Sequence, residues 1–160
     1  MSNSDKSPIK KAPIEIDDCS MARAADLLGD KWTLLILREL FYGVSRFEDL
    51  REDMSAPRAV LSQRLQRLVD EGIIEKHPYR ESGRRTRFEY RMTAKGFDLG
   101  LVLLALMQWG DKHLREDAEP LSVIDAKTRE KLSVALATRK GRVVPADQVT
   151  TRILARKTAR

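Results

Sequence analysis

The chain of 160 residues is poor in the side chains that build disulfides and metal sites, because it holds one cysteine and two histidines. The single Cys19 excludes a disulfide within the chain, and with only His77 and His113 beside it the ligands for a structural zinc site are too few. Long hydrophobic runs are also missing. The longest nearly pure apolar stretch, residues 99–107, is far below the roughly 20 residues that span a bilayer. No secretory signal is visible, so we expect a cytoplasmic protein without a membrane partner.

The signatures of common enzyme sites are absent as well. There is no glycine-rich phosphate loop and no nucleophile elbow. Four carboxylates stand close together in the sequence, but their spacing spreads them around a helix, which favours a solvated face over a catalytic pair. They are Glu48, Asp49, Glu52 and Asp53. Cys19 has no base partner beside it, so we expect no enzyme, no metal and no cofactor.

The excess of basic residues is concentrated in two regions. Residues 139–160 hold seven Lys and Arg against one acid, Asp147, and so supply the whole net charge of +6. In the remaining, neutral part, residues 58–95 hold ten basic and five acidic side chains, whereas residues 1–57 hold eight basic and eleven acidic. A local positive surface favours an anionic partner, and this one lies in the middle of the chain.

The first part of the chain predicts three helices. A short helix is expected at 20–28, and Asp30 can cap a second one at 31–42, whose apolar residues form a broad buried face. Ser45 and Glu48 have the Ser-x-x-Glu spacing of a capping box, which predicts that a third helix begins there.

A fourth helix, expected at 57–71, has two different faces. Leu61, Leu65 and Leu68 form an apolar stripe at spacings of three and four. The opposite face carries side chains that can hydrogen-bond base edges, with arginine suited to guanine, glutamine to adenine and serine to either. These candidate base-reading residues are Arg58, Ser62, Gln63, Gln66 and Arg67.

Two strands follow this helix, at 73–80 and 88–93, and Pro78 makes the first an edge strand. The loop between them is rich in arginine: Arg84, Arg85 and Arg87. A basic hairpin directly after two short helices has the order of a winged helix-turn-helix, whose wing lies along the DNA backbone or in the minor groove. We therefore predict a mainly α fold with a small β-wing.

Several short motifs between Cys19 and Trp109 fit one known pattern. They are the cysteine before the first helix, Gly29 with Lys31-Trp32, Arg46-Phe47 with Leu50, Leu61-Ser62-Gln63-Arg64-Leu65, Gly72-Ile73-Ile74, and Glu89-Tyr90 followed by Thr93 and Gly96. This stretch resembles the HxlR-type regulators, a prokaryotic branch related to the MarR winged-helix proteins. The resemblance implies a homodimeric transcription factor on a pseudo-palindromic operator, with one recognition helix per half-site. We add Lys31 and Arg46 as candidate phosphate contacts.

One departure from the pattern concerns the start of the recognition helix. Pro57 and Arg58 stand where relatives often have a serine-led cap, so the role of Arg58 is less defined than that of Gln63 or Arg67.

Cys19 has two interpretations. It precedes a helix N-terminus, where the dipole makes a thiol more reactive, and the resemblance implies a thiol-based sensor at this position. An unpaired cysteine is otherwise a small buried hydrophobic residue.

The segment 99–109 predicts a dimerisation helix. Only Gly100 and Gln108 interrupt its apolar residues, whereas a surface helix needs one apolar stripe. We expect its second face to pack on another copy about a two-fold axis. The residues chosen for this contact are Leu99, Leu103, Leu106 and Trp109. The alternative is burial under the C-terminal segment.

The predicted organisation is a flexible arm at 1–17, a DNA-binding and dimerisation domain at 18–118, and a basic extension at 119–160. In the extension, "KLSVALAT" and "QVTTRIL" can form a β-hairpin around "RKGR". Its basic end is either a solvated tail or a phosphate contact.

The sequence favours a sequence-specific, DNA-binding regulator, a repressor rather than an activator, modulated by oxidation of Cys19 or by a small effector. Four aromatic residues are candidates to line an effector pocket between subunits, although such residues are more often core. They are Trp32, Phe41, Tyr42 and Trp109. The alternative is a winged-helix module that binds protein or RNA without operator specificity.

Overall fold

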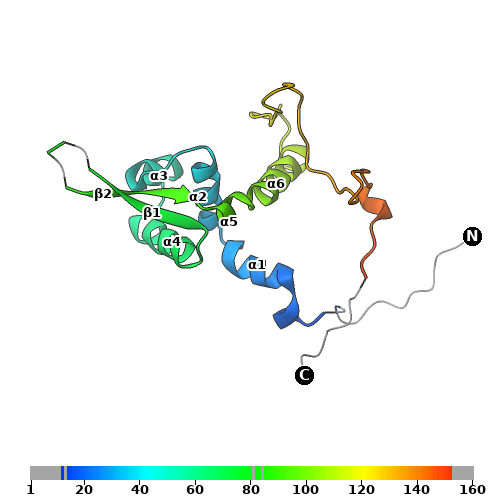
Figure 1. Cartoon of the computed structure of the whole chain (residues 1–160), viewed down its shortest axis with the longest axis horizontal. Coiled ribbons are helices and arrows are strands. Elements are labelled where there is room, and N and C mark those ends of the chain that lie inside the picture. The colour runs from blue at the N-terminus through cyan, green and yellow to red at the C-terminus, as the bar shows by residue number, and fades with distance from the viewer. Residues whose placement is uncertain (1–11, 13, 81, 84, 153–160) are drawn as a thin grey trace, which may run out of the picture. The chain divides into compact units, whose positions relative to one another are not determined.

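The computed structural model describes residues 12, 14–80, 82–83 and 85–152. Its internal contacts divide the chain into a central unit, residues 28–134, and a second unit made of the two ends. The central unit contains the helices and strands that Figure 1 labels α2 to α6, β1 and β2. Among the described residues, no helix is both long and apolar enough to cross a bilayer.

The helices and strands follow the predicted order. The helices are α1 (Ser20–Leu28), α2 (Lys31–Phe41), α3 (Phe47–Met54), α4 (Arg58–Asp70), α5 (Ala94–Phe97) and α6 (Gly100–His113). The strands are β1 (Ile74–Tyr79) and β2 (Arg87–Met92), and two short 3-10 helices span Ile16–Asp18 and Ala146–Gln148. The fold is therefore mainly helical with a two-stranded antiparallel wing, which is a winged helix-turn-helix.

The boundaries of α2 and α4 have local causes. The Asp30 carboxylate accepts from the amides of Trp32, at 2.8 Å, and Thr33, at 3.4 Å, so the predicted cap of α2 is confirmed. Gly43 and Gly72 follow α2 and α4 with φ of 92° and 65°, a backbone conformation that side chains with a Cβ rarely adopt.

The core lies between α2, α3, α4 and the first strand. The predicted stripe of α4 is confirmed, because Leu61, Leu65 and Leu68 are at most 1% exposed. They meet the fully buried Ile36, Leu37, Leu50 and Ile74. Burial of each such side chain contributes roughly 1.5–3 kcal/mol, so this cluster holds α4 with its other face outward.

The wing, residues 74–92, is tied to the turn between α2 and α3. β1 and β2 pair antiparallel from Ile74 opposite Met92 to Tyr79 opposite Arg87, which leaves β1 at the edge as predicted. The free edge of β2 is used as well: the Tyr90 amide donates to the Ser45 carbonyl at 2.8 Å, and Arg46 bridges to Glu89. The start of α3 is thereby fixed to the base of the wing.

The predicted capping box at α3 is wrong. The N-cap of α3 is Arg46, and no side chain caps the helix. The Ser45 backbone pairs with β2, so α3 begins one residue later than the motif indicated. Glu48 turns to Arg51 and Arg58 instead of reaching back to the cap.

The C-terminal extension contains turns and short bridges. The "RKGR" segment does turn, with the Gly141 amide donating to the Thr138 carbonyl at 2.8 Å. Its flanks pair Ala137 with Val143. In the described part of "QVTTRIL", residues 148–152, no pairing with this turn occurs. The predicted arm falls largely on residues 1–11 and 13, outside the described residues.

Candidate nucleic-acid interface

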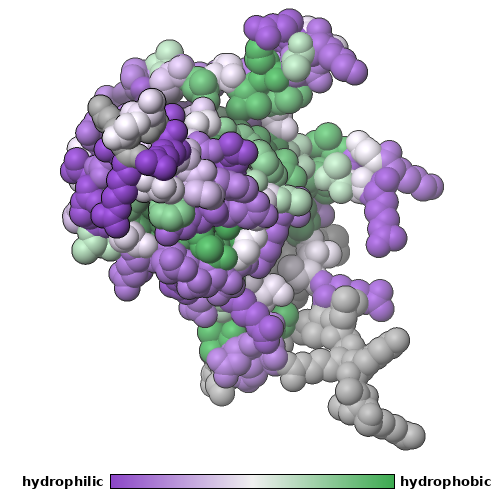
Figure 2. All heavy atoms as spheres, turned by 60° about the vertical axis from the view of Figure 1, so that its left-hand side comes forward, coloured by the Kyte–Doolittle hydropathy of each residue, from purple (hydrophilic) through white to green (hydrophobic). Residues whose placement is uncertain are grey.

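The outer face of α4 carries all five side chains that the sequence selected for base reading. Arg58, Ser62, Gln63, Gln66 and Arg67 are exposed, opposite the buried leucine stripe. We call them the recognition face. The Gln66 amide nitrogen donates to the Asp70 carboxylate at 2.8 Å, so Gln66 is held along the helix. In Figure 1 the wing projects beyond α3 and α4. Figure 2 turns this side forward and shows it covered mainly by hydrophilic residues.

Arg64, in the middle of α4, has a structural contact. It is half-buried and forms an ion pair with Asp30, which also caps α2. Burial opposes ionisation of Asp30, but the amides of Trp32 and Thr33 and the Arg64 guanidinium hold the pKa of this carboxyl below its usual value. Asp30 therefore joins α4 to the start of α2.

Arg58, at the start of α4, is held by two neighbours from α3. Its Nη2 forms an ion pair with Glu48 Oε1, and its guanidinium lies over the Phe47 ring at 5.1 Å. Glu48 also accepts from Arg51 Nε at 2.9 Å. Hydrogen bonds from Arg51 and Arg58 lower the pKa of Glu48, so its carboxylate stays charged at neutral pH.

The starts of α3 and α4 and the outer half of the paired strands of the wing form one crevice of about 230 Å³. It is lined by Phe47, Glu48, Arg58, Tyr79, Arg87, Phe88 and Tyr90. Nearby, the Arg46 guanidinium stacks over the Tyr79 ring at 4.5 Å. Three arginines from separate parts of the sequence thus lie in or beside this crevice: Arg46, Arg58 and Arg87. No local sequence pattern predicted that they are close together.

The wing carries its exposed cations toward the tip. Arg85 and Arg87 are exposed, and Arg84 lies outside the described residues. Lys76, which the sequence analysis did not select, places Nζ 4.1 Å from the Phe88 ring centre. The sequence feature that could have found Lys76 is a basic residue in the strand that leads into the arginine-rich loop.

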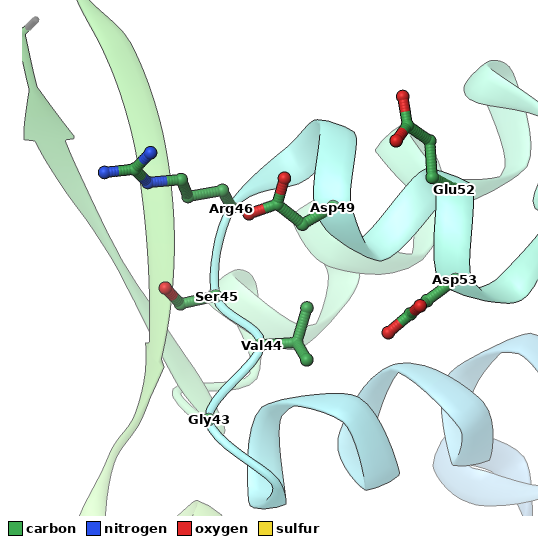
Figure 3. A pocket seen from close by; sticks show the side chains of 7 residues that line it. All are labelled: Gly43, Val44, Ser45, Arg46, Asp49, Glu52 and Asp53. Atoms are coloured by element: carbon green, nitrogen blue, oxygen red, sulfur yellow. The ribbon is translucent and has the colours of Figure 1, made fainter.

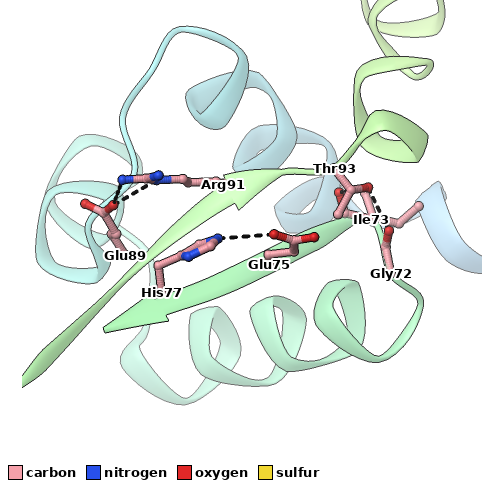
Figure 4. A network of polar contacts seen from close by, with 7 residues as sticks. All are labelled: Gly72, Ile73, Glu75, His77, Glu89, Arg91 and Thr93. Atoms are coloured by element: carbon pink, nitrogen blue, oxygen red, sulfur yellow. Dashed lines mark hydrogen bonds and ion pairs between the residues drawn. The ribbon is translucent and has the colours of Figure 1, made fainter. Parts of the chain in front are cut away.

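Toward the base of the wing the polar side chains contact one another (Figure 4). Arg91 Nε donates to Glu89 Oε1 at 2.9 Å, and His77 Nε2 lies 3.2 Å from Glu75 Oε2. The Thr93 hydroxyl donates to the Gly72 carbonyl at 2.8 Å, which fastens the end of β2 to the end of α4.

An acidic pocket bounds the basic surface. Asp49, Glu52 and Asp53 line it together with residues 43–46 (Figure 3). Arg46 extends over the strand and away from these carboxylates. Among the described residues no group of three or more His, Cys, Asp or Glu is placed to hold a metal ion. This side of α3 would repel DNA phosphates.

Glu39 of α2, which interacts with Asp53 of the acidic pocket, is 3% exposed. Burial raises its pKa above the usual value, the neighbouring Arg38 lowers it, and Asp53 raises it further. Sequence reasoning missed this residue, because Glu39 sits within an apolar helix without any motif.

Lys31 and Cys19 stand at the starts of helices. Lys31 is exposed at the first residue of α2, with Nζ 5.2 Å from the centre of the Trp32 ring. Cys19 is half-buried directly before α1, and its carbonyl accepts from the Arg23 amide at 3.1 Å. Cys19 therefore occupies the N-cap position of α1, as the sequence indicated.

A wide apolar groove of about 770 Å³ is lined by residues of α2, of α6 and of the segment after α6. Phe41, Tyr42 and Trp109 line it, as does Leu121 from the segment after α6, whereas Trp32 does not. The groove has one charged side chain, Arg38, in its wall.

The predicted dimerisation residues of α6 fall into two groups. Leu106 and Trp109 are 48% and 56% exposed, while Leu99 and Leu103 are half-buried within the chain. The C-terminal segment covers part of α6, because Gln108 Oε1 accepts from the Val134 amide at 2.9 Å. Burial under that segment is thus only partial, and a large apolar surface stays open.

Comparison with known proteins gives the chain a family. The sequence model for HxlR-like helix-turn-helix proteins matches residues 27–118, more than half of the chain. The chain belongs to the HxlR-like helix-turn-helix family. The resemblance noted from the sequence is confirmed, and this family is one of transcriptional regulators rather than enzymes.

Two curated relatives illustrate the similarity. The uncharacterised HTH-type transcriptional regulator Rv3095 of Mycobacterium tuberculosis is 46% identical over 105 residues, which are 65% of this chain and 65% of that protein. The chain thus spans less than two thirds of the length of this mycobacterial relative. The regulator sll1512 of Synechocystis is 34% identical over 66% of this chain and 78% of its own length.

Solved structures agree with the winged helix-turn-helix fold. The transcription-factor candidate PA1607 is 29% identical with a TM-score of 0.72, over 84% of this chain and 94% of that chain. The reduced form of the Bacillus subtilis transcriptional regulator YodB is 27% identical with a TM-score of 0.51, over 62% and 97% of the two chains.

Proposed function

We propose that the protein is a sequence-specific DNA-binding transcriptional regulator that acts in the cytoplasm as a homodimer on a pseudo-palindromic operator. The observation that carries the proposal is the recognition face of α4, exposed beside a crevice lined by Arg58 and Arg87. The N-terminal residues of a recognition helix contact base edges in the major groove, and a flanking wing contacts the backbone or the minor groove. Family membership supports the same function.

The proposed roles divide the interface into reading and holding residues. Ser62, Gln63, Gln66 and Arg67, with Arg58, read bases; the wing arginines hold the DNA, and Lys31 and Arg46 add phosphate contacts. Arg84 belongs to the proposed wing set by sequence alone, because it lies outside the described residues.

The test is a selection of bound sequences from a random duplex pool at near-physiological salt, with reduced protein. An enriched inverted repeat is the expected result, and its half-site spacing of about one helical turn reports the distance between two recognition helices. A folded dimer that enriches no sequence would contradict the proposal and favour a module that binds protein or RNA. Repression is then tested by transcription from a promoter that contains the selected operator.

We further propose that oxidation of Cys19 regulates this binding. Its place at the N-cap of α1 supports the proposal, because Cys19 is only half-buried and an oxidant can reach a thiol that is not fully enclosed. With one cysteine per chain, oxidation yields a disulfide between subunits, a mixed disulfide or a sulfenic acid. Operator affinity is expected to change on treatment with a thiol oxidant in the wild type and to stay constant in Cys19→Ser. An equal response of both proteins rules out Cys19 as the sensor.

A further inference from the structure

Arg58 is more constrained than its exposure indicates. Its side chain is 66% exposed, yet Glu48 pairs with Nη2 and the Phe47 ring lies 5.1 Å from Cζ. An arginine side chain that is free in solution loses rotamer entropy when it is ordered on a ligand. Arg58 has already lost part of this freedom before any DNA arrives.

The residue that holds Arg58 is itself fixed. Glu48 accepts from Arg51 Nε at 2.9 Å on the same helix. The helix α3 is anchored by the buried Leu50 and by the hydrogen bond from the Tyr90 amide to the Ser45 carbonyl. The position of the Arg58 guanidinium is therefore set by α3 and the wing base as well as by α4.

The carboxylate also selects what Arg58 can bind. A phosphate that approached this guanidinium would come close to the charged Glu48 and be repelled, whereas a base edge is neutral. Glu48 uses one nitrogen of the guanidinium fork, which leaves further N–H donors for a second acceptor. Guanine presents two acceptors, O6 and N7, in the major groove.

We propose that Glu48 is a specificity-determining positioning residue, which holds Arg58 so that it reads a guanine at the edge of each half-site and disfavours phosphate contact there. The inference rests on the proposed function, and it defines more closely the base-reading role of Arg58, which the sequence left less defined than that of Gln63 or Arg67. Glu48 does not touch DNA; it acts through Arg58.

The base pair that Arg58 reads is first identified as the one at which Arg58→Ala abolishes the sequence preference. The experiment then measures the affinities of the full chain for the selected operator, for a non-specific duplex, and for operators substituted at that base pair. Glu48→Gln is compared with Glu52→Gln, a matched control on the same helix. Glu52 is 74% exposed and lies 3.9 Å from Arg51, so the control removes the same charge and leaves Arg58 in place. Both variants are expected to bind non-specific DNA more tightly, because each removes a negative charge.

Only Glu48→Gln is expected to lower the ratio of operator affinity to non-specific affinity, by about fivefold or more. This loss of specificity is expected only at the base pair that Arg58 reads. In an Arg58→Ala background the same change should have no further effect on this ratio. Glu48→Asp keeps the charge and shortens the reach, so it should lose specificity at the same base pair. Thermal unfolding monitors the folded state of every variant.

Two results overturn the inference. If Glu48→Gln and Glu52→Gln preserve the ratio equally, Glu48 contributes only charge. If Glu48→Gln tightens binding to every duplex beyond the control and keeps the ratio, Glu48 competes with DNA for Arg58 instead of positioning it. A wild-type protein without operator preference is a different failure: it overturns the proposed function itself, and the random-pool selection detects it before any variant is made.

Discussion

At the scale of single residues, one carboxylate connects two helices. Asp30 caps α2 through the amides of Trp32 and Thr33 and pairs with Arg64 of α4. Because its pKa is lowered in the folded state, the stability that its charge contributes is present above the unfolded pKa and is lost as pH falls through the folded pKa.

We predict that Asp30→Ala lowers the free energy of unfolding by at least about 1 kcal/mol at neutral pH, since a cap and an ion pair are both lost. Asp30→Asn keeps a capping oxygen and should cost less. Urea unfolding at pH 7 and at acid pH checks this. The difference between wild type and Asp30→Asn should shrink at acid pH; a constant difference would contradict the contribution of the charge.

The pKa of Glu39 is shifted in the opposite direction to that of Asp30. Burial raises its pKa, so the folded state binds this proton more readily than the unfolded state. The associated stability is fully present below the unfolded pKa and is lost as pH rises through the folded pKa.

We therefore predict that Glu39→Gln gains stability relative to the wild type as pH rises from about 4 to about 7. Thermal unfolding across this range measures the gain. Glu52→Gln, at an exposed carboxylate of α3, is the matched control for the removal of one carboxylate charge from the surface. A Glu39→Gln curve parallel to that of the wild type would show that Glu39 does not titrate in this way.

At the scale of elements, the recognition helix and the wing have separate roles. The wing is held on one side by the Tyr90–Ser45 hydrogen bond and at its base by Thr93, while α4 is held by its leucine stripe. Two elements fixed independently to the core can contact DNA with different consequences for affinity and specificity.

We predict that Arg87→Ala weakens binding to all duplexes similarly and lowers the salt slope by about one unit, because it removes a phosphate contact. Gln63→Ala should instead relax preference at particular base pairs, by about 1–3 kcal/mol for each lost bidentate contact. Binding titrations at several salt concentrations, with operator and random duplexes, separate the two effects. Equal loss of specificity in both variants would contradict this division.

At the scale of the whole molecule, α6 carries an exposed apolar surface. Leu101, Leu106 and Trp109 are 48–68% exposed on one short helix, beside the groove shared with α2. Exposed apolar residues gathered in this way mark an interaction surface, and a second copy about a two-fold axis is the simplest one.

We predict that Leu106→Asp yields a folded monomer with strongly reduced operator affinity. A charge at a half-exposed position costs little in the isolated chain but disrupts an apolar interface. Sedimentation analysis gives the mass, and a titration on the operator gives the affinity. Lys112→Asp, at an exposed residue of the last turn, should remain dimeric; a dimeric Leu106→Asp protein would place the interface elsewhere.

The sequence by itself determined the features that depend on neighbours along the chain. The spacing of Leu61, Leu65 and Leu68 fixes which face of α4 is buried, and so exposes Gln63 on the other. The strand pattern around the arginine loop predicted the wing for the same local reason. The predicted fold, the cap at Asp30 and the family resemblance were confirmed on this basis.

Only the tertiary structure decided which distant side chains meet. Ser45 failed as a cap because its backbone joins β2, and this pairing depends on residues more than forty positions later. The same packing brings Glu48 to Arg58, and Arg58 into one crevice with Arg87. Such contacts depend on the docking of α3 against the wing and α4, which is a long-range energy balance that no local pattern encodes.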